Sequence, residues 1–144
     1  MSADCIFCRI AARQAQGHYL YQDDCCTAFL DVSPFNPGHT LVVPNQHFAR
    51  LADLPPDVGA HLFKIGARIS QAIADSSLRS DGFNLFLSDG ECAGQEVPHI
   101  HLHVLPRFAQ DGLHVDLGRV PDRAGSAELV ATASTITECL RGET

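Results

Sequence analysis

The sequence predicts an α+β fold: a mainly antiparallel, five-stranded sheet with one long helix between the third and fourth strands, and a C-terminal helix. Two observations predict it. Strand-like apolar runs are joined by connections too short for helical crossovers, and the two longest stretches of helical periodicity lie after the third run and at the chain end. The 144 residues contain no repeat or linker, so we expect one domain over residues 1–144.

Turn residues separate the predicted strands. Asp23 and Asp24 join the first two strands into a hairpin, and a segment rich in proline and glycine, 33–38, precedes the third. A glycine-containing loop, 89–95, leads to the fifth strand. The predicted strands are residues 18–22, 25–31, 39–44, 83–88 and 97–105.

The long helix is predicted from its start signal and its apolar face. Asp53 is expected to be the N-cap, with Pro55 and Pro56 in the first turn, and the helix should end by residues 76–80. Apolar residues at helical spacing place one face in the core: Val58, Leu62, Ile65, Ile69 and Ile73. We expect two further helices, at residues 8–14 and 127–141.

Composition and charge exclude several classes of partner. The formal net charge is −7, and the single lysine and nine arginines form no basic stripe, so we expect no nucleic-acid polymer as partner. No apolar stretch approaches the roughly 18 residues of a membrane span, and the first residues lack the features of a signal peptide. We therefore expect a cytoplasmic protein with no membrane partner.

Three histidines alternate with apolar residues in the fifth predicted strand. His99, His101 and His103 would share one face, and a chance placement of three imidazoles there is improbable. Neighbouring members would lie about 7 Å apart, whereas the outer pair would be about 13 Å apart and poorly placed for one shared metal ion. This spacing favours separate roles for His99 and for the other two.

A closed zinc site can be assembled around His99. Cys5 and Cys8 have the spacing with which two thiolates hold one Zn²⁺, and His47 could complete a Cys₂His₂ set. Four protein ligands leave no open position for water, so such a zinc would be structural. The alternative is that the two cysteines are buried thiols near the N-terminus.

His101 and His103 are then available for phosphate chemistry. A neutral imidazole is a competent nucleophile toward phosphorus, and a second imidazole can hold phosphoryl oxygens and assist the leaving group. Just upstream, Gly94 permits close backbone approach, and the Gln95 amide could contact a phosphate oxygen or an attacking water.

Four segments of the chain resemble the histidine-triad superfamily, and in particular its bacterial-type nucleotide hydrolases with a zinc site. Their order and spacing match as well, and the most specific segment is the last, in which Gly-Gln precedes His-x-His-x-His. The likeness covers residues 5–107 and not the tail and helix of residues 108–144. The segments are CIFCRI at 5–10, AFLDVSP at 28–34, NPGHTLVVP at 36–44 and AGQEVPHIHLHVLPR at 93–107.

The resemblance implies an α+β homodimer that acts on small nucleotides through a nucleotidyl-histidine intermediate. It implies that His101 is the nucleophile, that His103 contacts the scissile phosphate, and that His39 supports the active-site histidine. Zinc-containing relatives use the positions of the four ligands proposed above. The remaining implied nucleotide-binding positions are Asp31 at the ribose, Phe29 and Val32 at the base, and Ser88, Gly94, Glu96 and Val97 near the phosphate and leaving group.

Two residues depart from the pattern of the phosphoramidase branch of the superfamily. Glu96 stands where many relatives have Ser or Thr, and Ser88 where many have Asn. A carboxylate at position 96 would repel an extended polyphosphate or accept a proton donor on the leaving group. Both departures concern the leaving group rather than the nucleophile.

Three functions are therefore open. The first is a hydrolase or transferase that cleaves a nucleoside phosphoramidate, a mixed anhydride or a dinucleoside polyphosphate at the nucleoside 5′-phosphorus. The second is a metal-dependent hydrolase that uses the histidine cluster as ligands. The third is a nucleotide-binding regulatory module with vestigial activity.

Overall fold

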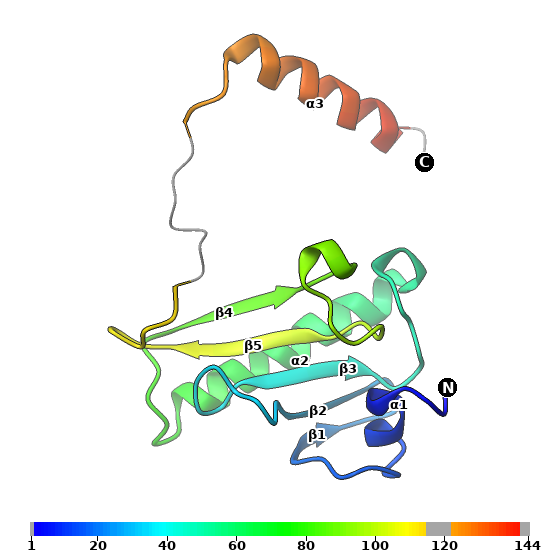
Figure 1. Ribbon diagram of the computed structural model, residues 1–144, viewed down its shortest axis with the longest axis vertical. Helices are drawn as coiled ribbons and strands as arrows, with labels where there is room; N and C mark the ends of the chain where they lie inside the picture. The colour runs from blue at the N-terminus through cyan, green and yellow to red at the C-terminus, as the bar shows by residue number, and fades with distance from the viewer. Residues whose placement is uncertain (1, 115–121, 142–144) are drawn as a thin grey trace. The chain divides into compact units, whose positions relative to one another are not determined.

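In a computed structural model, five antiparallel strands form one sheet in the order β1-β2-β3-β5-β4 (Figure 1). The structure describes residues 2–114 and 122–141. The strands are β1 Tyr19–Gln22, β2 Cys26–Leu30, β3 Thr40–Pro44, β4 Gly82–Leu87 and β5 Leu102–Arg107. The helices are α1 Ile6–Ala11, α2 Pro56–Ala74 and α3 Ser126–Arg141, with 3₁₀ turns η1 Leu51–Asp53 and η2 Glu91–Ala93. The predicted α+β class, the long helix after the third strand and the C-terminal helix are confirmed.

The chain forms two compact units, residues 1–112 and 113–144. The sheet, α1 and α2 belong to the first unit, and α3 belongs to the second. None of the helices in the described ranges is long and apolar enough to cross a membrane. Our expectation of one domain over residues 1–144 stays a prediction.

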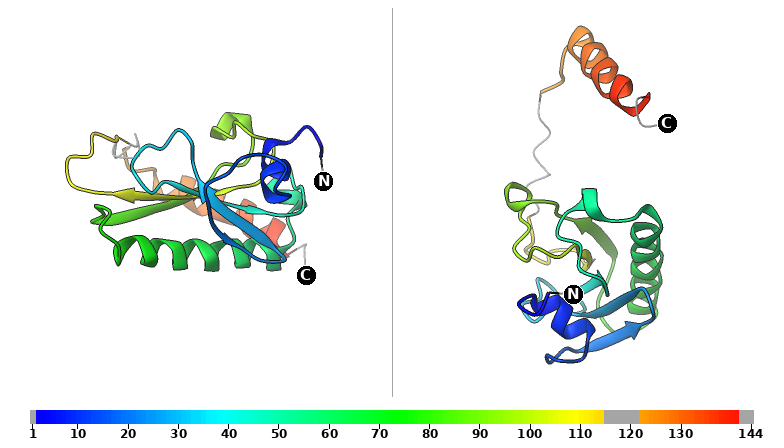
Figure 2. Two further views of the ribbon diagram at one scale, coloured as in Figure 1. Left: turned by 90° about the horizontal axis from the view of Figure 1, so that it is seen from below. Right: turned by 90° about the vertical axis from the view of Figure 1, so that its right-hand side faces the viewer.

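The sheet carries an apolar core on each face. Figure 2 shows α2 along one face and α1 above the other. Successive residues of a strand point to opposite faces, so Val42 packs toward α2 while Leu41 and Val43 pack toward α1. The helix lies close to the sheet at Gly66, where a Cβ atom would come within 2.8 Å of the Leu102 side chain. Four of the five predicted core residues of α2 are buried: Leu62, Ile65, Ile69 and Ile73.

The fifth strand begins at Leu102, five residues later than predicted. The His99 N–H donates to the Val97 carbonyl, and the Ile100 N–H donates to the carbonyl of Phe48 outside the sheet (2.8 and 2.7 Å). Pro98 has no N–H to give to a neighbouring strand. His99 and His101 therefore precede the strand, and the alternation of histidines only partly reflects a strand.

Two helix boundaries also differ from the prediction. Asp53 ends the turn η1 and is not the N-cap of α2, which begins at Pro56 after Pro55 with no side-chain cap. Two consecutive prolines preset the backbone for the first helical turn, so this helix starts without a capping side chain. Helix α1 spans Ile6–Ala11 rather than 8–14, because Arg13 adopts a left-handed φ of 61°.

Asp23 ties the β1–β2 turn to α2. One carboxylate oxygen accepts hydrogen bonds from the backbone N–H groups of Cys25 and Cys26, each 2.8 Å long. The other accepts from the Tyr21 hydroxyl at 2.8 Å and lies 2.7 Å from Nε2 of His61, a residue of α2. Burial alone would raise the pKa of Asp23, but these donors outweigh it and lower the pKa well below its ordinary 3.8.

We predict that Asp23→Asn destabilises the protein near neutral pH and that its deficit shrinks in acid. A carboxylate with a depressed folded-state pKa stabilises fully above its unfolded pKa and loses that contribution as the pH falls toward the folded value. Urea unfolding between pH 2.5 and 7 should show the gap between wild type and Asp23→Asn narrowing below about pH 4. The exposed neighbour Asp24 provides the control, because Asp24→Asn should stay close to wild type at each pH. A gap independent of pH would contradict the prediction.

Candidate active site and metal site

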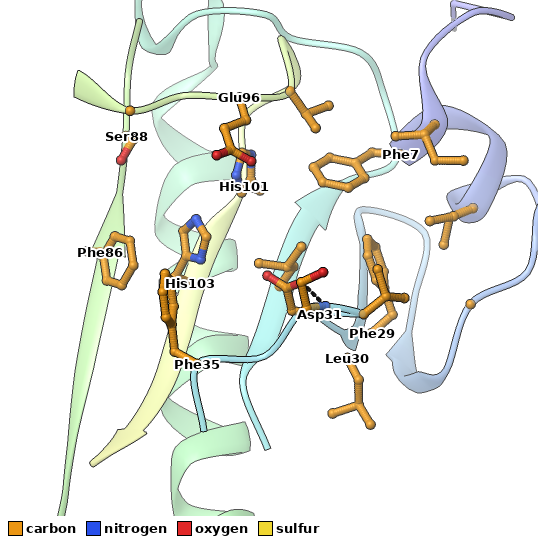
Figure 3. A pocket seen from close by; sticks show the side chains of 18 of the residues that line it. Phe7, Phe29, Leu30, Asp31, Phe35, Phe86, Ser88, Glu96, His101 and His103 are labelled. Atoms are coloured by element: carbon orange, nitrogen blue, oxygen red, sulfur yellow. Dashed lines mark hydrogen bonds between the residues drawn. The ribbon is translucent and has the colours of Figure 1, made fainter. Parts of the chain in front are cut away.

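His103 lies on β5 and is framed by the neighbouring strands. It pairs in register with Leu41 of β3 and Phe86 of β4. The Phe86 ring stacks on the His103 imidazole with centroids 4.2 Å apart and planes within 7°. Figure 3 shows the two rings facing each other at the edge of the pocket. Two sheet neighbours therefore fix the orientation of this imidazole.

His101 lies just before β5, and a backbone hydrogen bond fixes its tautomer. Its Nδ1 lies 2.8 Å from the carbonyl oxygen of His99. A carbonyl can only accept, so Nδ1 carries the proton and Nε2 keeps a lone pair. The imidazole is 6% exposed and meets the edge of Phe7, with ring centroids 5.1 Å apart. His101 thus offers an oriented basic nitrogen.

His39 gives His103 the opposite hydrogen-bond polarity. The Phe35 N–H donates to Nδ1 of His39 at 3.3 Å, so the proton of a neutral His39 lies on Nε2. That Nε2 lies 2.9 Å from Nδ1 of His103 and donates to it, which leaves the His103 proton on Nε2. The pair of neighbouring histidines therefore presents one acceptor nitrogen, from His101, and one donor N–H, from His103.

Burial favours the neutral forms of His103 and His39. Burial and, to a smaller extent, the neighbouring His101 and His39 lower the pKa of His103 to about 4. Burial also lowers the pKa of His39, against a smaller opposite effect of Asp31, whose carboxylate is 3.8 Å from Nε2. The neutral rings of His103 and His39 preserve their tautomers described above at physiological pH.

A cavity of about 750 Å³ opens beside these imidazoles (Figure 3). Nine of the predicted catalytic and nucleotide-binding residues line it: Phe29, Asp31, Val32, Ser88, Gly94, Glu96, Val97, His101 and His103. His39 lies behind His103, outside this lining. The structure thus brings together most of the predicted site.

Gln95 lies elsewhere than expected, because its side chain is not part of the cavity lining. Its Oε1 accepts from the Gly90 N–H at 2.7 Å, and its Nε2 donates to the Ala49 carbonyl at 2.9 Å. Both ends of the amide are thus used by backbone groups. Gly90 and Gly94 turn this loop with left-handed φ values of 92° and 88°. In this structure Gln95 holds in place the loop whose residues Ala93, Gly94 and Glu96 line the cavity, and its side chain does not reach the histidines.

The four predicted zinc ligands converge on one point. Their ligand atoms lie within 4.8 Å of one another, although the residues come from α1 and the residue just before it, the segment after β3 and the segment before β5. The sulfur of Cys8 lies 3.3 Å from Nδ1 of His47 and 3.5 Å from Nδ1 of His99, and the two Nδ1 atoms are 3.2 Å apart. A tetrahedral zinc with sulfur and nitrogen ligands has edges of about 3.3–3.8 Å, so the donor set fits this ion.

His99 connects the metal cluster to the active site. Its Nε2 donates to the Pro44 carbonyl at 2.9 Å, which leaves Nδ1 unprotonated and directed toward Cys5, at 3.4 Å. Its own backbone carbonyl is the group that orients His101. One residue therefore contributes its ring to the metal cluster and its backbone to the neighbouring histidine.

Comparison with known proteins identifies the family. The HIT domain matches residues 12–110 of this chain. The chain belongs to the HIT family. A HIT-like protein from Mycobacterium tuberculosis is 40% identical over 133 residues, covering 90% of this chain and 92% of the relative. Adenylylsulfatase HINT3 from Arabidopsis thaliana is 36% identical over 138 residues, covering 96% of this chain and 68% of the relative.

A solved structure with a bound metal is also similar. The Zn-bound histidine triad family protein from Mycobacterium smegmatis is 39% identical, with a TM-score of 0.75 over 95% of this chain and 97% of the other. The predicted resemblance to HIT proteins, including zinc-containing ones, is confirmed.

The sequence analysis missed three aromatic residues of this HIT site. Phe7 contacts the rings of Phe29, His99 and His101, Phe35 stacks on His39, and Phe86 stacks on His103. Strand pairing could have identified Phe86, because it is directly opposite His103 in the antiparallel register. No local pattern indicates Phe7 or Phe35, whose contacts depend on tertiary packing.

We predict that the purified protein binds one zinc ion per chain through this cluster. Cys8→Ser should abolish the zinc, measured by elemental mass spectrometry, and lower Tm by roughly 10 °C. The half-buried Cys25, outside the cluster, supplies the matched control, because Cys25→Ser should keep the zinc. Zinc that persists in Cys8→Ser would refute the assignment of ligands.

We further predict that Gln95 holds its loop in place. Gln95→Ala removes both amide hydrogen bonds, so the amide protons of residues 89–95 should exchange with solvent roughly tenfold faster. Hydrogen exchange followed by mass spectrometry measures this change. Gln71→Ala, which removes an exposed amide on α2, should leave the exchange of this segment unaltered. Equal exchange in wild type and Gln95→Ala would exclude the bracing role.

Proposed function

We propose that this protein is a nucleotide hydrolase or transferase that cleaves at the nucleoside 5′-phosphorus through a covalent intermediate on His101. The observation that carries the proposal is the opposite hydrogen-bond polarity of two imidazoles on one cavity. In the tautomer of His101, Nε2 is the ring nitrogen with a free lone pair, so the attack would come from this atom. The neighbouring His103 offers its Nε2–H as a hydrogen-bond donor. A nucleophile next to a hydrogen-bond donor is the arrangement that phosphoryl-group transfer needs.

The proposed reaction has two displacements. In the first, the His101 Nε2 lone pair forms a bond to phosphorus as the bond from phosphorus to the leaving group breaks, and the leaving group takes a proton from solvent while the His103 N–H donates a hydrogen bond to a phosphoryl oxygen. In the second, water attacks phosphorus, the P–N bond to His101 breaks with its electron pair returning to Nε2, and the water proton passes to solvent. The products are a nucleoside monophosphate and the protonated leaving group, and an alcohol or amine in place of water would give group transfer.

The cavity can hold the nucleoside part of such a substrate. Its volume of about 750 Å³ lies within the range of small-molecule sites. Phe29 and Val32 provide apolar walls for a base, and the Asp31 carboxylate can accept hydrogen bonds from ribose hydroxyls. One Asp31 oxygen is already oriented by the Ser33 N–H at 2.9 Å. These contacts give a nucleotide its orientation toward His101.

Relatives and metal chemistry support the same proposal. The similarity to an adenylylsulfatase supports a hydrolase of nucleotide phosphoryl compounds. We propose a structural zinc at Cys5, Cys8, His47 and His99, supported by the donor geometry and the Zn-bound relative. The proposal includes a cytoplasmic homodimer whose partners are small nucleotides rather than nucleic-acid polymers or membranes.

A metal-dependent hydrolase is the second candidate. Asp31, His39 and His103 also bring ligand atoms within 4.8 Å of one another, so they could gather around an ion. Chelation separates the two proposals: activity lost while circular dichroism shows an intact fold would favour metal-assisted hydrolysis over attack by His101.

We predict that His101→Ala abolishes the covalent intermediate. Incubation with an α-labelled substrate and an alkaline quench should leave an acid-labile nucleotidyl adduct on His101 of the wild type. His101→Ala should form none and should lose activity by roughly a thousandfold or more. His114→Ala, at an exposed histidine outside the cavity, is the control and should behave as wild type.

The same variant tests the regulatory alternative. Calorimetry should show that His101→Ala still binds a nucleoside monophosphate, because base and ribose contacts remain. If wild type forms no adduct and turns over no substrate while nucleotide still binds, the protein is a binding module rather than an enzyme.

A further inference from the structure

The cavity is unusual in its charge for a site that receives phosphate. The charged side chains in its described lining are two carboxylates, Asp31 and Glu96, and that lining contains no lysine or arginine. A ligand with several negative charges would therefore meet repulsion from these carboxylates without a compensating lysine or arginine in the described lining.

Two nearby arginines do not offset the negative charge of the cavity lining. Arg50 approaches the loop that follows β4, but its Nε donates to the Asp89 carboxylate at 2.9 Å. Arg13 stacks over the Tyr19 ring at 3.5 Å and donates to Gln22. Both guanidinium groups have partners outside the cavity lining.

The two carboxylates occupy different ends of the site. Figure 3 shows Ser88 and Glu96 toward one end and Asp31 and Phe29 toward the other, with His101 and His103 between them. Asp31 is held by the Ser33 N–H and lies 3.8 Å from His39. Glu96 is exposed, and within residues 2–114 and 122–141 no hydrogen bond holds its carboxylate. Glu96 is thus free to meet the group at the far side of the phosphorus from the nucleoside.

We propose that Glu96 determines the leaving group: it makes the site select nucleoside 5′-phosphoryl compounds whose leaving group is an amine, against those whose leaving group is a polyanion. This inference rests on the proposed function and assigns the substrate class within it. Phe29 and Asp31 line the end of the cavity that would hold the nucleoside. Glu96 therefore acts on the leaving group rather than on the nucleotidyl group that becomes bonded to His101.

Cleavage of a P–N bond gives the Glu96 carboxylate a specific role. The nitrogen of a phosphoramidate departs as a neutral amine only after it has taken up a proton, which solvent supplies. A carboxylate beside the nitrogen stabilises that protonated, cationic form. His101 Nε2 then forms its bond to phosphorus, the electron pair of the breaking P–N bond goes to the nitrogen, and the free amine leaves. A polyphosphate leaving group develops additional negative charge and is opposed by the same carboxylate.

Two substrates that deliver the same adenylyl group test the inference. One is the adenosine 5′-phosphoramidate of a primary alkylamine, and the other is diadenosine tetraphosphate, whose leaving group is a polyanion. Wild type should show a higher kcat/KM for the phosphoramidate. Glu96→Gln removes the charge at nearly constant shape, and it should lower the ratio of the two kcat/KM values by roughly tenfold. Glu96→Lys should lower it further.

Controls separate this charge effect from a general defect. Glu91→Gln removes an exposed carboxylate from the same loop but outside the cavity lining, and it should leave the ratio unchanged. Raising the salt concentration should weaken the preference of wild type and have little effect in Glu96→Gln, because ions screen an exposed charge.

The outcomes distinguish this inference from the proposed function. An adduct on His101 with a ratio that is the same in wild type and Glu96→Gln would overturn the role of Glu96 and leave the reaction intact. Absence of both turnover and adduct with either substrate would overturn the reaction itself.

Discussion

His99 is the residue on which the rest of the site depends. Its ring nitrogen Nε2 is fixed by the Pro44 carbonyl, its Nδ1 faces Cys5, Cys8 and His47, and its carbonyl accepts from His101. The ring is fully buried, so none of these bonds competes with water. The backbone N–H groups of His99 and Ile100 donate to carbonyls outside the sheet, so β5 cannot extend toward the N-terminus and begins only at Leu102.

The proposed zinc site and the proposed phosphate chemistry would be neighbours with separate roles. Four protein ligands would satisfy a zinc ion completely, so it would have no position for substrate or water. Such an ion would hold the segment before β5 in place, and the His99 carbonyl in that segment fixes the tautomer of His101. The hydrogen bonds from the Phe35 N–H to His39 and from His39 to His103 fix the tautomer of His103. Two independent backbone anchors thus give two adjacent imidazoles opposite polarity.

Patterns that depend on nearby residues were predictable from the sequence, and those that depend on distant backbone groups were not. Apolar runs bounded by turn residues predicted the five strands, and Cys-x-x-Cys spacing predicted that Cys5 and Cys8 would lie with His47 and His99. The sequence could not show that Pro98 and the Phe48 carbonyl delay the start of β5, or that Gln95 turns away from the histidines to bridge Gly90 and Ala49. Those outcomes depend on which carbonyl and N–H groups remain unpaired after the sheet has formed.

The neutrality of the His103 imidazole and the absence of lysine and arginine from the described cavity lining bear on the proposed reaction together. Protonated histidines would attract polyphosphates but would provide neither a nucleophilic lone pair at His101 nor an acceptor at Nδ1 of His103. Burial that keeps the His103 ring neutral therefore removes a charge that could hold phosphate, and in the proposed reaction recognition would depend on hydrogen bonds and shape. In such a site a single exposed carboxylate such as Glu96 would influence the leaving group more strongly than it would beside a lysine or an arginine, because no stronger positive field cancels it.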